Sequence, residues 1–256
     1  MADRADLLFC AGATTDSGNP LDAARRRRQM GINLERGIRR NRQRPGQALD
    51  IAERTKWPYP EQPLAGKRNS YNGLLRLVAR KEQRGGQDWT AGSIWTRQTF
   101  QYGYFECRYR YAEAEGLNNS FWLMPTGTNK ITRGKLFEID INEGHFPDTL
   151  NLNIHNHSDT HVVNGKPTHP TSPRKFTRSG NNFAREVHVY GLEWNENELV
   201  FYLDGTELRR VKNEFCHSPA SIYLSLAVIP WAGKVTDAID GKAMEVDQVR
   251  VYRRKQ

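Results

Sequence analysis

The feature that most constrains the fold of this sequence is a period-two alternation of apolar and polar residues, which begins near residue 71 and recurs to the C-terminus. The apolar positions of the segments 104–111 and 150–157 are Phe105, Cys107, Tyr109, Tyr111, Leu150, Leu152 and Ile154. Such alternation is typical of antiparallel strands with one face in a core. No long amphipathic helix competes with it, so the sequence predicts an all-β protein.

Similar alternation marks further strands toward the C-terminus, at 199–203, 222–228 and 246–252. The first of these runs into Asp204-Gly205, a dipeptide typical of a hairpin turn. The strands follow one another without intervening helices. This order indicates a sandwich or barrel of antiparallel sheets.

The length of 256 residues is enough to bury a large core, and 10 Phe, 10 Tyr and 6 Trp are too many aromatic residues for a disordered chain. No apolar run approaches the roughly 18 residues that a membrane-spanning helix needs. Three cysteines, Cys10, Cys107 and Cys216, are too few and too dispersed for a disulfide framework or a zinc site. We therefore expect a globular monomer with no membrane partner.

The net charge of +9 is concentrated in the first 45 residues, which hold ten arginines, no lysine and five acids. This segment has neither helical nor strand periodicity. One interpretation is an arm that binds nucleic acid. We favour a disordered or non-native extension, because Phe9 is its only aromatic residue for stacking on bases. The sequence thus predicts an arginine-rich tail at 1–45, one domain at 46–256, and no nucleic-acid partner.

The segment 136–143 carries three acids within six residues and reads Leu-Phe-Glu-Ile-Asp-Ile-Asn-Glu. Alternation places Glu138 and Asp140 on one face of a strand. The residues turned inward are Phe137, Ile139 and Ile141. A regular strand would also point Glu143 into the core, a poor place for an unpaired acid. A β-bulge near 141–142 would return Glu143 to the face of the other two acids.

Three carboxyl groups on one face suit retaining glycoside hydrolysis, which needs a nucleophilic carboxylate and a protonated carboxylic acid about 5–5.5 Å apart. In this arrangement Asp140 would hydrogen-bond to Glu138, and the local negative charge would raise the pKa of Glu143 and keep it protonated. The alternative interpretation is a solvated acidic strand face. Spacing alone leaves both interpretations open.

The segment Glu-Ile-Asp-Ile-Asn-Glu at 138–143 resembles the active-site strand of glycoside hydrolase family sixteen, whose version with the extra residue is Glu-x-Asp-x-x-Glu. Five further stretches match that family in order: Phe100-Gln-Tyr-Gly-Tyr-Phe-Glu-Cys-Arg108, Ser120-Phe-Trp-Leu-Met124, Tyr190-Gly-Leu-Glu-Trp194, Phe201-Tyr-Leu-Asp-Gly205 and Val246-Asp-Gln-Val-Arg-Val-Tyr252. The resemblance covers about residues 70–252. It implies a concanavalin-like β-jelly-roll sandwich of two curved antiparallel sheets, with a substrate cleft on the concave face.

By position in the motif, the resemblance implies Glu138 as nucleophile, Asp140 as its assistant and Glu143 as acid/base. It also implies that Trp122 stacks on sugar beside the scissile bond and that His155 lies near the nucleophile. The other predicted substrate-binding residues are Asn153, Trp95, Trp231 and Arg108. Indole planes stack on the C–H faces of sugars, and guanidinium groups suit sulfate.

The remaining tryptophans, Trp57, Trp89 and Trp194, are interpreted as core residues. Arg110, Arg133 and Lys135 accompany Arg108 as candidate sulfate ligands, with a solvated surface as the alternative. No cofactor is predicted for catalysis. His145, His155, His157 and His161 invite a metal-site interpretation, but we favour substrate hydrogen bonding by His155. The resemblance allows a structural calcium ion with Asp247 as a ligand.

The resemblance implies a retaining endo-glycanase with an extracellular or periplasmic location, although the first residues do not form an export signal. The run Arg133-Gly-Lys-Leu-Phe-Glu138 departs from glucan-cleaving members, whereas Asn118-Asn-Ser-Phe-Trp122 is similar to members acting on agar, porphyran or carrageenan. An algal galactan is therefore the expected substrate. The alternatives are a β-1,3-glucanase and a non-catalytic carbohydrate-binding jelly roll.

Overall fold

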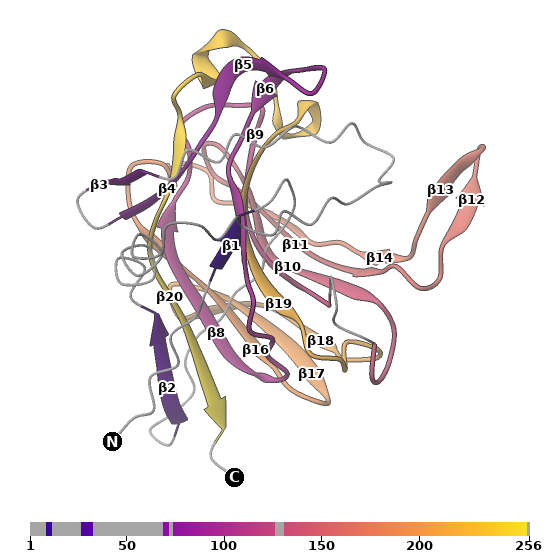
Figure 1. The fold of residues 1–256 in the computed structure, drawn as a ribbon. Coiled ribbons are helices and arrows are strands. Elements are labelled where there is room, and N and C mark those ends of the chain that lie inside the picture. The colour runs from indigo at the N-terminus through magenta and orange to yellow at the C-terminus, as the bar shows by residue number, and fades with distance from the viewer. Residues whose placement is uncertain (1–8, 12–26, 33–68, 72–73, 126–130, 255–256) are drawn as a thin grey trace, which may run out of the picture.

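The computed structural model describes residues 9–11, 27–32, 69–71, 74–125 and 131–254 of the chain. These residues form two antiparallel sheets that lie one over the other (Figure 1). The strands of the first sheet, in spatial order, are β1 (Phe9–Ala11), β7 (Ser93–Thr96), β19 (Ser221–Val228), β9 (Leu117–Met124), β10 (Phe137–His145), β11 (Thr149–Asn156) and β14 (Thr171–Ser172), with β15 (Lys175–Thr177) also paired to β11.

The second sheet forms the other layer. In spatial order it contains β18 (Thr206–Lys212), β17 (Glu198–Leu203), β16 (His188–Trp194), β8 (Gly103–Arg110), β20 (Ala243–Arg254), β4 (Leu74–Val78) and β3 (Asn69–Tyr71), with β2 (Arg27–Ile32) also paired to β20. The smaller elements are the β5–β6 hairpin (Arg80–Arg84, Gln87–Thr90), the β12–β13 hairpin (His161–Val163, Lys166–Thr168) and two 3₁₀ helices, η1 (Pro230–Ala232) and η2 (Asp237–Ile239).

Strands distant in sequence are neighbours in both sheets. In the first sheet β19 lies between β7 and β9, and in the second β20 lies between β4 and β8. Every strand pairing in the described part of the chain is antiparallel. The all-β sandwich predicted from alternation is confirmed.

The core lies between the two sheets and is built from the residues that alternation turned inward. β8 contributes Phe105, Cys107 and Tyr109, while Ile139 of β10 and Leu224 of β19 come from the facing sheet. Burying a large apolar side chain stabilises a fold by about 1.5–3 kcal/mol. A one-residue slip of a strand would turn its apolar row outward, so this burial fixes the register. The opposite face of the first sheet is left for polar side chains.

The turn predicted at Asp204-Gly205 joins β17 to β18. Both residues have positive φ angles, 49° and 78°. A two-residue hairpin loop favours this backbone, and glycine adopts it without steric cost. The turn prediction is confirmed.

Two short strands lie within the segment that the sequence predicts to be a tail. β1 pairs with β7 at the edge of the first sheet, and β2 pairs with β20. Backbone hydrogen bonds to an existing sheet edge require no side-chain alternation, which explains why periodicity missed both strands. The rest of 1–45, the boundary at 46 and Trp57 lie outside the described residues, so the tail and domain boundary stay predictions.

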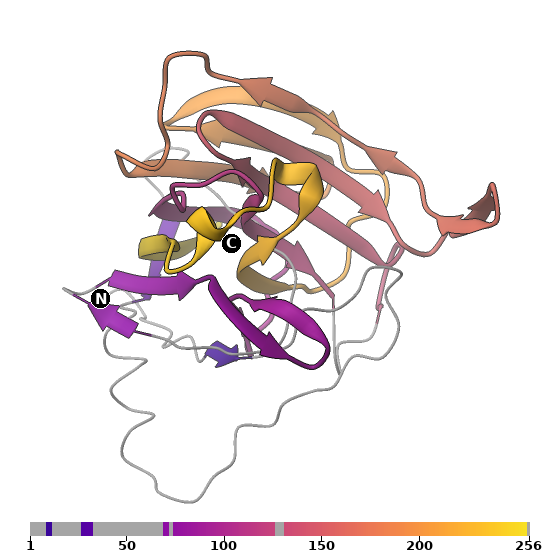
Figure 2. The ribbon, with the colours of Figure 1, turned by 90° about the horizontal axis from the view of Figure 1, so that it is seen from above.

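The β12–β13 hairpin projects away from the two sheets in both views of the molecule (Figures 1 and 2). It carries two exposed apolar side chains, Val162 and Val163. Among the described residues there is no helix with the length and apolarity needed to cross a bilayer.

Candidate active site

A β-bulge interrupts strand β10 between its acidic residues. Asp140 lies opposite Asn153 of β11, but the next acidic residue, Glu143, lies opposite Asn151, so three positions on β10 face two on β11. The register with β9 shifts in the same place, between Asp140 and Asn142. The predicted bulge is therefore present, and it turns Glu143 out of the core.

Asn142 anchors this bulge from inside the core. Its Nδ2 atom donates hydrogen bonds of 2.7 Å to the Tyr109 hydroxyl and 2.8 Å to the Tyr111 hydroxyl. Gly144 completes the fit, because a Cβ atom there would lie 2.2 Å from Cζ of Tyr111. With Asn142 turned inward and no side chain at Gly144, Glu143 is left on the outer face.

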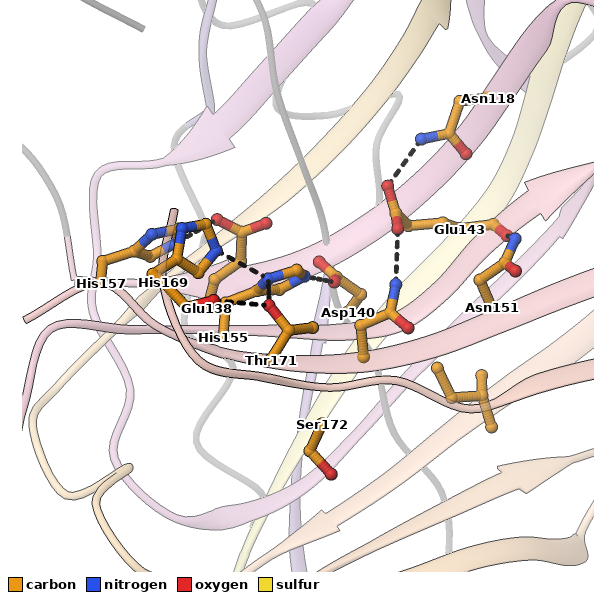
Figure 3. Close-up of polar contacts among 12 residues, drawn as sticks. Asn118, Glu138, Asp140, Glu143, Asn151, His155, His157, His169, Thr171 and Ser172 are labelled. Carbon is orange, nitrogen blue, oxygen red and sulfur yellow. Dashed lines mark hydrogen bonds and ion pairs between the residues drawn. The ribbon is translucent and has the colours of Figure 1, made fainter. Parts of the chain in front are cut away.

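The carboxyl group of Glu143 is held between two asparagine side chains. Asn118 Nδ2 donates to Oε1 at 2.8 Å, and Asn153 Nδ2 donates to Oε2 at 2.7 Å (Figure 3 shows Asn118 above Glu143). Burial raises the pKa of Glu143 to about 7, the Asn118 hydrogen bond opposes that rise, and the negative charge of Glu138 adds to it. The predicted direction of the shift is confirmed, but burial contributes more than the neighbouring charge. Near pH 7 Glu143 can therefore exist as an acid or as a base.

Glu138 is in a different electrostatic environment. Burial alone would raise its pKa, but a hydrogen bond from His157 and the nearby imidazoles outweigh burial and hold the pKa of Glu138 below its usual value. The His157 Nε2 atom lies 2.8 Å from Glu138 Oε2. Glu138 is therefore an ionised carboxylate at a pH where Glu143 is still largely protonated.

Asp140 lies between these two groups and is fully buried. Its Oδ2 atom lies 2.9 Å from His155 Nε2, and a side-chain hydrogen bond also links Asp140 to Glu138, as the sequence predicts. His155 lies on β11 directly opposite Glu138, so its ring reaches Asp140 diagonally across the two strands. Burial, followed by the charges of Glu143 and Glu138, raises the pKa of Asp140 well above its usual value.

Three histidines gather at the Glu138 end of the site (Figure 3). The rings of His155 and His157 are stacked with centroids 5.8 Å apart, and His169 packs against both. Burial, then the charges of His157 and His155, lower the pKa of His169 to about 4. In the described part of the chain, one group has metal-ligating atoms close together, within 4.8 Å: Glu138, Asp140 and His155. The Asp140 carboxylate and the His155 imidazole of this group already contact each other.

A second apolar cluster lies beside the acids on the same face of the first sheet. Trp122 is in register with Asp140 on one side and with Tyr223 on the other. Its ring stacks on Tyr223 at 4.5 Å, and Tyr223 stacks on Trp95 at 5.9 Å. Trp122 is only 2% exposed, whereas Trp95 is half-buried, so Trp95 offers more surface to a ligand than Trp122 does.

Trp231 lies at the opposite end of the acidic strand from the histidines. It belongs to η1, is 55% exposed, and its ring contacts His145 at the end of β10 with centroids 5.0 Å apart. Of the other tryptophans, Trp194 is buried in the core and Trp89 packs against it, as predicted.

Arg108 does not reach this site, and that prediction is wrong. It lies on β8 of the second sheet and is ion-paired with Asp247. Alternation on β8 turns Phe105, Cys107 and Tyr109 toward the first sheet, so Arg108 faces away from it. The other candidate sulfate ligands are also paired, as Arg110–Glu245, Arg133–Glu196 and Lys135–Asp159.

Asp247 was predicted as a calcium ligand. The guanidinium group of Arg108 donates a hydrogen bond to Oδ2 of Asp247. A calcium ion would have to compete with this ion pair for that oxygen. The calcium ion itself stays a prediction.

Several residues of the site were given no catalytic or substrate-binding role by the sequence. His157 entered the sequence analysis only in the metal-site interpretation, although alternation places it on the same face as His155. Asn118 lies beside the acids because β9 pairs with β10, and Tyr223 lies on the same face because β19 pairs with β9. His169 lies between β13 and β14, where the sequence carries no periodic signal.

The geometry assembles an ionised carboxylate, a buried carboxyl group with a pKa of about 7, and stacked aromatic rings on one face of a sheet. A carboxylate and a protonated carboxyl group form the pair that can attack a glycosidic carbon and protonate its leaving oxygen. No other cluster in the described residues combines these groups.

Comparisons with known proteins agree with this geometry. The profile of the glycosyl hydrolases family 16 matches residues 57–250. The endo-1,3-1,4-beta-glycanase EglC of Rhizobium meliloti is 30% identical over 194 residues, which cover 71% of this chain and 38% of that protein. The kappa-carrageenase of Pseudoalteromonas carrageenovora is 25% identical over 219 residues, covering 71% of this chain and 55% of that protein. The matched region thus spans well under two thirds of either relative.

Among solved structures, the laminarinase from Rhodothermus marinus superimposes with a TM-score of 0.61 at 25% identity. The superposition covers 73% of this chain and 80% of that one. The jelly-roll sandwich expected from the sequence is confirmed by this likeness.

Proposed function

This chain belongs to glycosyl hydrolase family 16, and on that premise we propose that it is a retaining endo-glycanase that hydrolyses internal β-glycosidic bonds of a polysaccharide. The observation that carries the proposal is the difference between its two glutamates. Glu138 has a lowered pKa and Glu143 has a pKa raised to about 7, although both lie on one strand. Pairs of carboxyl groups with opposed shifts are the mark of a nucleophile and a general acid.

In the first step, a carboxylate oxygen of Glu138 attacks the anomeric carbon and forms an ester. The bond from that carbon to the leaving oxygen breaks, and Glu143 gives its proton to that oxygen. In the second step, Glu143 takes a proton from water, whose oxygen attacks the anomeric carbon and releases Glu138. Two inversions give net retention.

Asp140 and the histidines support the nucleophile in this proposal. His157 holds one oxygen of Glu138, and His155 holds Asp140 beside it. Trp95, which is half-buried, is proposed to bind a sugar ring on its exposed surface. The role of Trp122 is then to hold Tyr223, the ring on which Trp95 stacks.

Two classes of polysaccharide are candidate substrates. Relatives named endo-1,3-1,4-beta-glycanase and beta-glucanase favour a β-1,3- or mixed-linkage glucan. The relative named kappa-carrageenase, together with the segment 118–122, favours an algal galactan. A location outside the cytoplasm is proposed with either substrate.

The proposal is tested with Glu138→Gln and Glu143→Gln. Each should lower the release of reducing ends from the substrate by at least about a thousandfold, while circular dichroism and oligosaccharide binding stay near those of the wild type. Glu186→Gln, an exposed glutamate outside the site, is the matched control and should keep full activity. The substrate panel contains laminarin, mixed-linkage glucan, agarose, porphyran and carrageenan.

Proton NMR of the first products tests the stereochemistry, which should show the β-anomer before mutarotation. An initial α-anomer would contradict retention. Binding of oligosaccharide without any hydrolysis by the wild type would favour the alternative function, a non-catalytic carbohydrate-binding domain.

A further inference from the structure

One cation shares the face of the three acids, and no proposed catalytic step uses it. Within the described strands of the first sheet, Lys175 is the only lysine or arginine. It lies on β15 directly opposite Asn151 of β11. Residues directly opposite each other in an antiparallel pair point to the same side of a sheet. Lys175 is therefore on the outer face with Asn151, while its neighbour Phe176 packs against the core.

Lys175 lies close to the proposed acid/base. The side chain of Asn151 donates to the backbone oxygen of Glu143 at 2.9 Å, so one residue separates the lysine from the bulge. The lysine charge also reaches His145. Burial, and then that charge, lower the pKa of His145 to about 4, which leaves this imidazole neutral.

Among the described residues, the ammonium group of Lys175 has no acidic partner. The described lysines that take part in ion pairs are Lys81, Lys135, Lys212 and Lys242. The candidate sulfate ligands of the sequence analysis all have acidic partners, so they are not available to a ligand in the way that Lys175 is.

An exposed aromatic surface completes this end of the strand. His145 contacts the ring of Trp231, which is 55% exposed. An exposed indole offers a stacking plane for a pyranose ring, and an unpaired ammonium offers a partner for an anion. Trp231 contacts His145 directly, and Lys175 lies beyond β11 from His145.

We propose that Lys175, His145 and Trp231 form a subsite that binds a sugar unit bearing an anionic group, either a sulfate ester or a carboxylate, at the Glu143 end of the acidic strand. This inference rests on the proposed function, because it names the substrate class of the same site. It favours an anionic polysaccharide over a neutral glucan.

The test uses two matched pairs of polymers. The first pair is a sulfated galactan and the same galactan after chemical desulfation, and the second is a β-glucan oxidised to carboxylate at C6 and its unoxidised parent. The wild type should prefer the anionic member of at least one pair in kcat/KM, and the pair that shows the preference identifies the anion. The preference should weaken at high salt.

Lys175→Met removes the charge and keeps the length of the side chain. The ratio of kcat/KM for the anionic over the neutral polymer should fall about tenfold, as expected for the loss of a charge-assisted hydrogen bond. Lys175→Arg should restore most of the ratio. The matched control is Lys166→Met on the projecting β12–β13 hairpin, which makes the same change at another exposed lysine and should leave the ratio unaltered.

Binding measurements separate this inference from the proposed function. Calorimetric titration of anionic oligosaccharides into Glu138→Gln should show weaker binding when Lys175→Met is added. If the wild type cleaves no polymer but this difference in binding remains, the subsite stands and the hydrolase proposal fails. Equal cleavage of both members of both pairs, equal losses for both members in Lys175→Met, or no binding of either anionic oligosaccharide would overturn the subsite.

Discussion

Asn118 on β9 donates a 2.8 Å hydrogen bond from Nδ2 to Oε1 of Glu143 on β10, and both side chains are buried. The bond stabilises the ionised form of Glu143, whereas burial stabilises the protonated form. The balance leaves the pKa of Glu143 at about 7. Asn118 is thus a positioning residue that lowers the pKa of the proposed acid, Glu143.

The first prediction concerns the pH profile of the wild type. Because Glu143 must be protonated to act on the free substrate, kcat/KM should fall as pH rises through about 7. Because Glu138 must be ionised, it should also fall on the acidic side, below the usual pKa of a glutamate. Initial rates from pH 3 to 9 measure both limbs. A flat profile between pH 6 and 9 would contradict the assignment of Glu143.

The second prediction concerns Asn118→Ala. Removing the hydrogen bond favours the protonated acid, so the alkaline limb should move up by roughly 0.5–1 pH unit, equivalent to about 1 kcal/mol. The pH dependence of kcat/KM measures the shift, which a purely structural role would not produce. Asn197→Ala, at an exposed turn, is the control and should leave the limb in place.

The third prediction concerns His157, which holds the proposed nucleophile. In His157→Leu, Glu138 loses the hydrogen bond that lowers its pKa, so the acidic limb should move to higher pH. His157→Gln retains a hydrogen-bond donor, so its acidic limb should lie close to the pH of the wild-type limb. Identical acidic limbs in His157→Leu and the wild type would show that the bond does not stabilise the carboxylate.

The fourth prediction links Glu143 to stability. Its pKa in the folded protein is raised above the unfolded value, so its favourable contribution is present below about pH 4.5 and is lost as pH rises through about 7. Glutamine does not titrate. The free energy of unfolding of Glu143→Gln, relative to the wild type, should therefore increase between pH 5 and pH 8. Urea unfolding at both pH values checks the sign, and a decrease would refute it.

The fifth prediction concerns the anchor of the bulge. Asn142→Leu removes hydrogen bonds to the hydroxyls of Tyr109 and Tyr111 and should lower the free energy of unfolding by about 2–3 kcal/mol. Tyr109→Phe and Tyr111→Phe should each account for part of this loss, and double-mutant cycles in urea unfolding measure the coupling. Activity in Asn142→Leu should fall more than in either tyrosine variant, because only this change removes the anchor. Additive effects with full activity would mean that Asn142 does not hold the bulge.

Local sequence determined much of this protein. Alternation identified the strands and their inward rows, such as Phe105 to Tyr109, because side chains on a strand point alternately to its two faces. The same rule identified the bulge, since a regular strand would have buried Glu143 without a partner. The family resemblance then supplied the proposed roles of the acids.

Pairing between distant strands decided the rest. Asn118 lies beside Glu143 because β9 pairs with β10, and Trp122 stacks on Tyr223 because β19 pairs with β9. A sequence does not state which strands are neighbours. Arg108 and Lys175 illustrate the consequence. Arg108 lies on the second sheet with an acidic partner, whereas Lys175 lies beside the acids and has no acidic partner among the described residues. Charge and spacing are local properties, whereas the partner of a charged group is set by long-range packing.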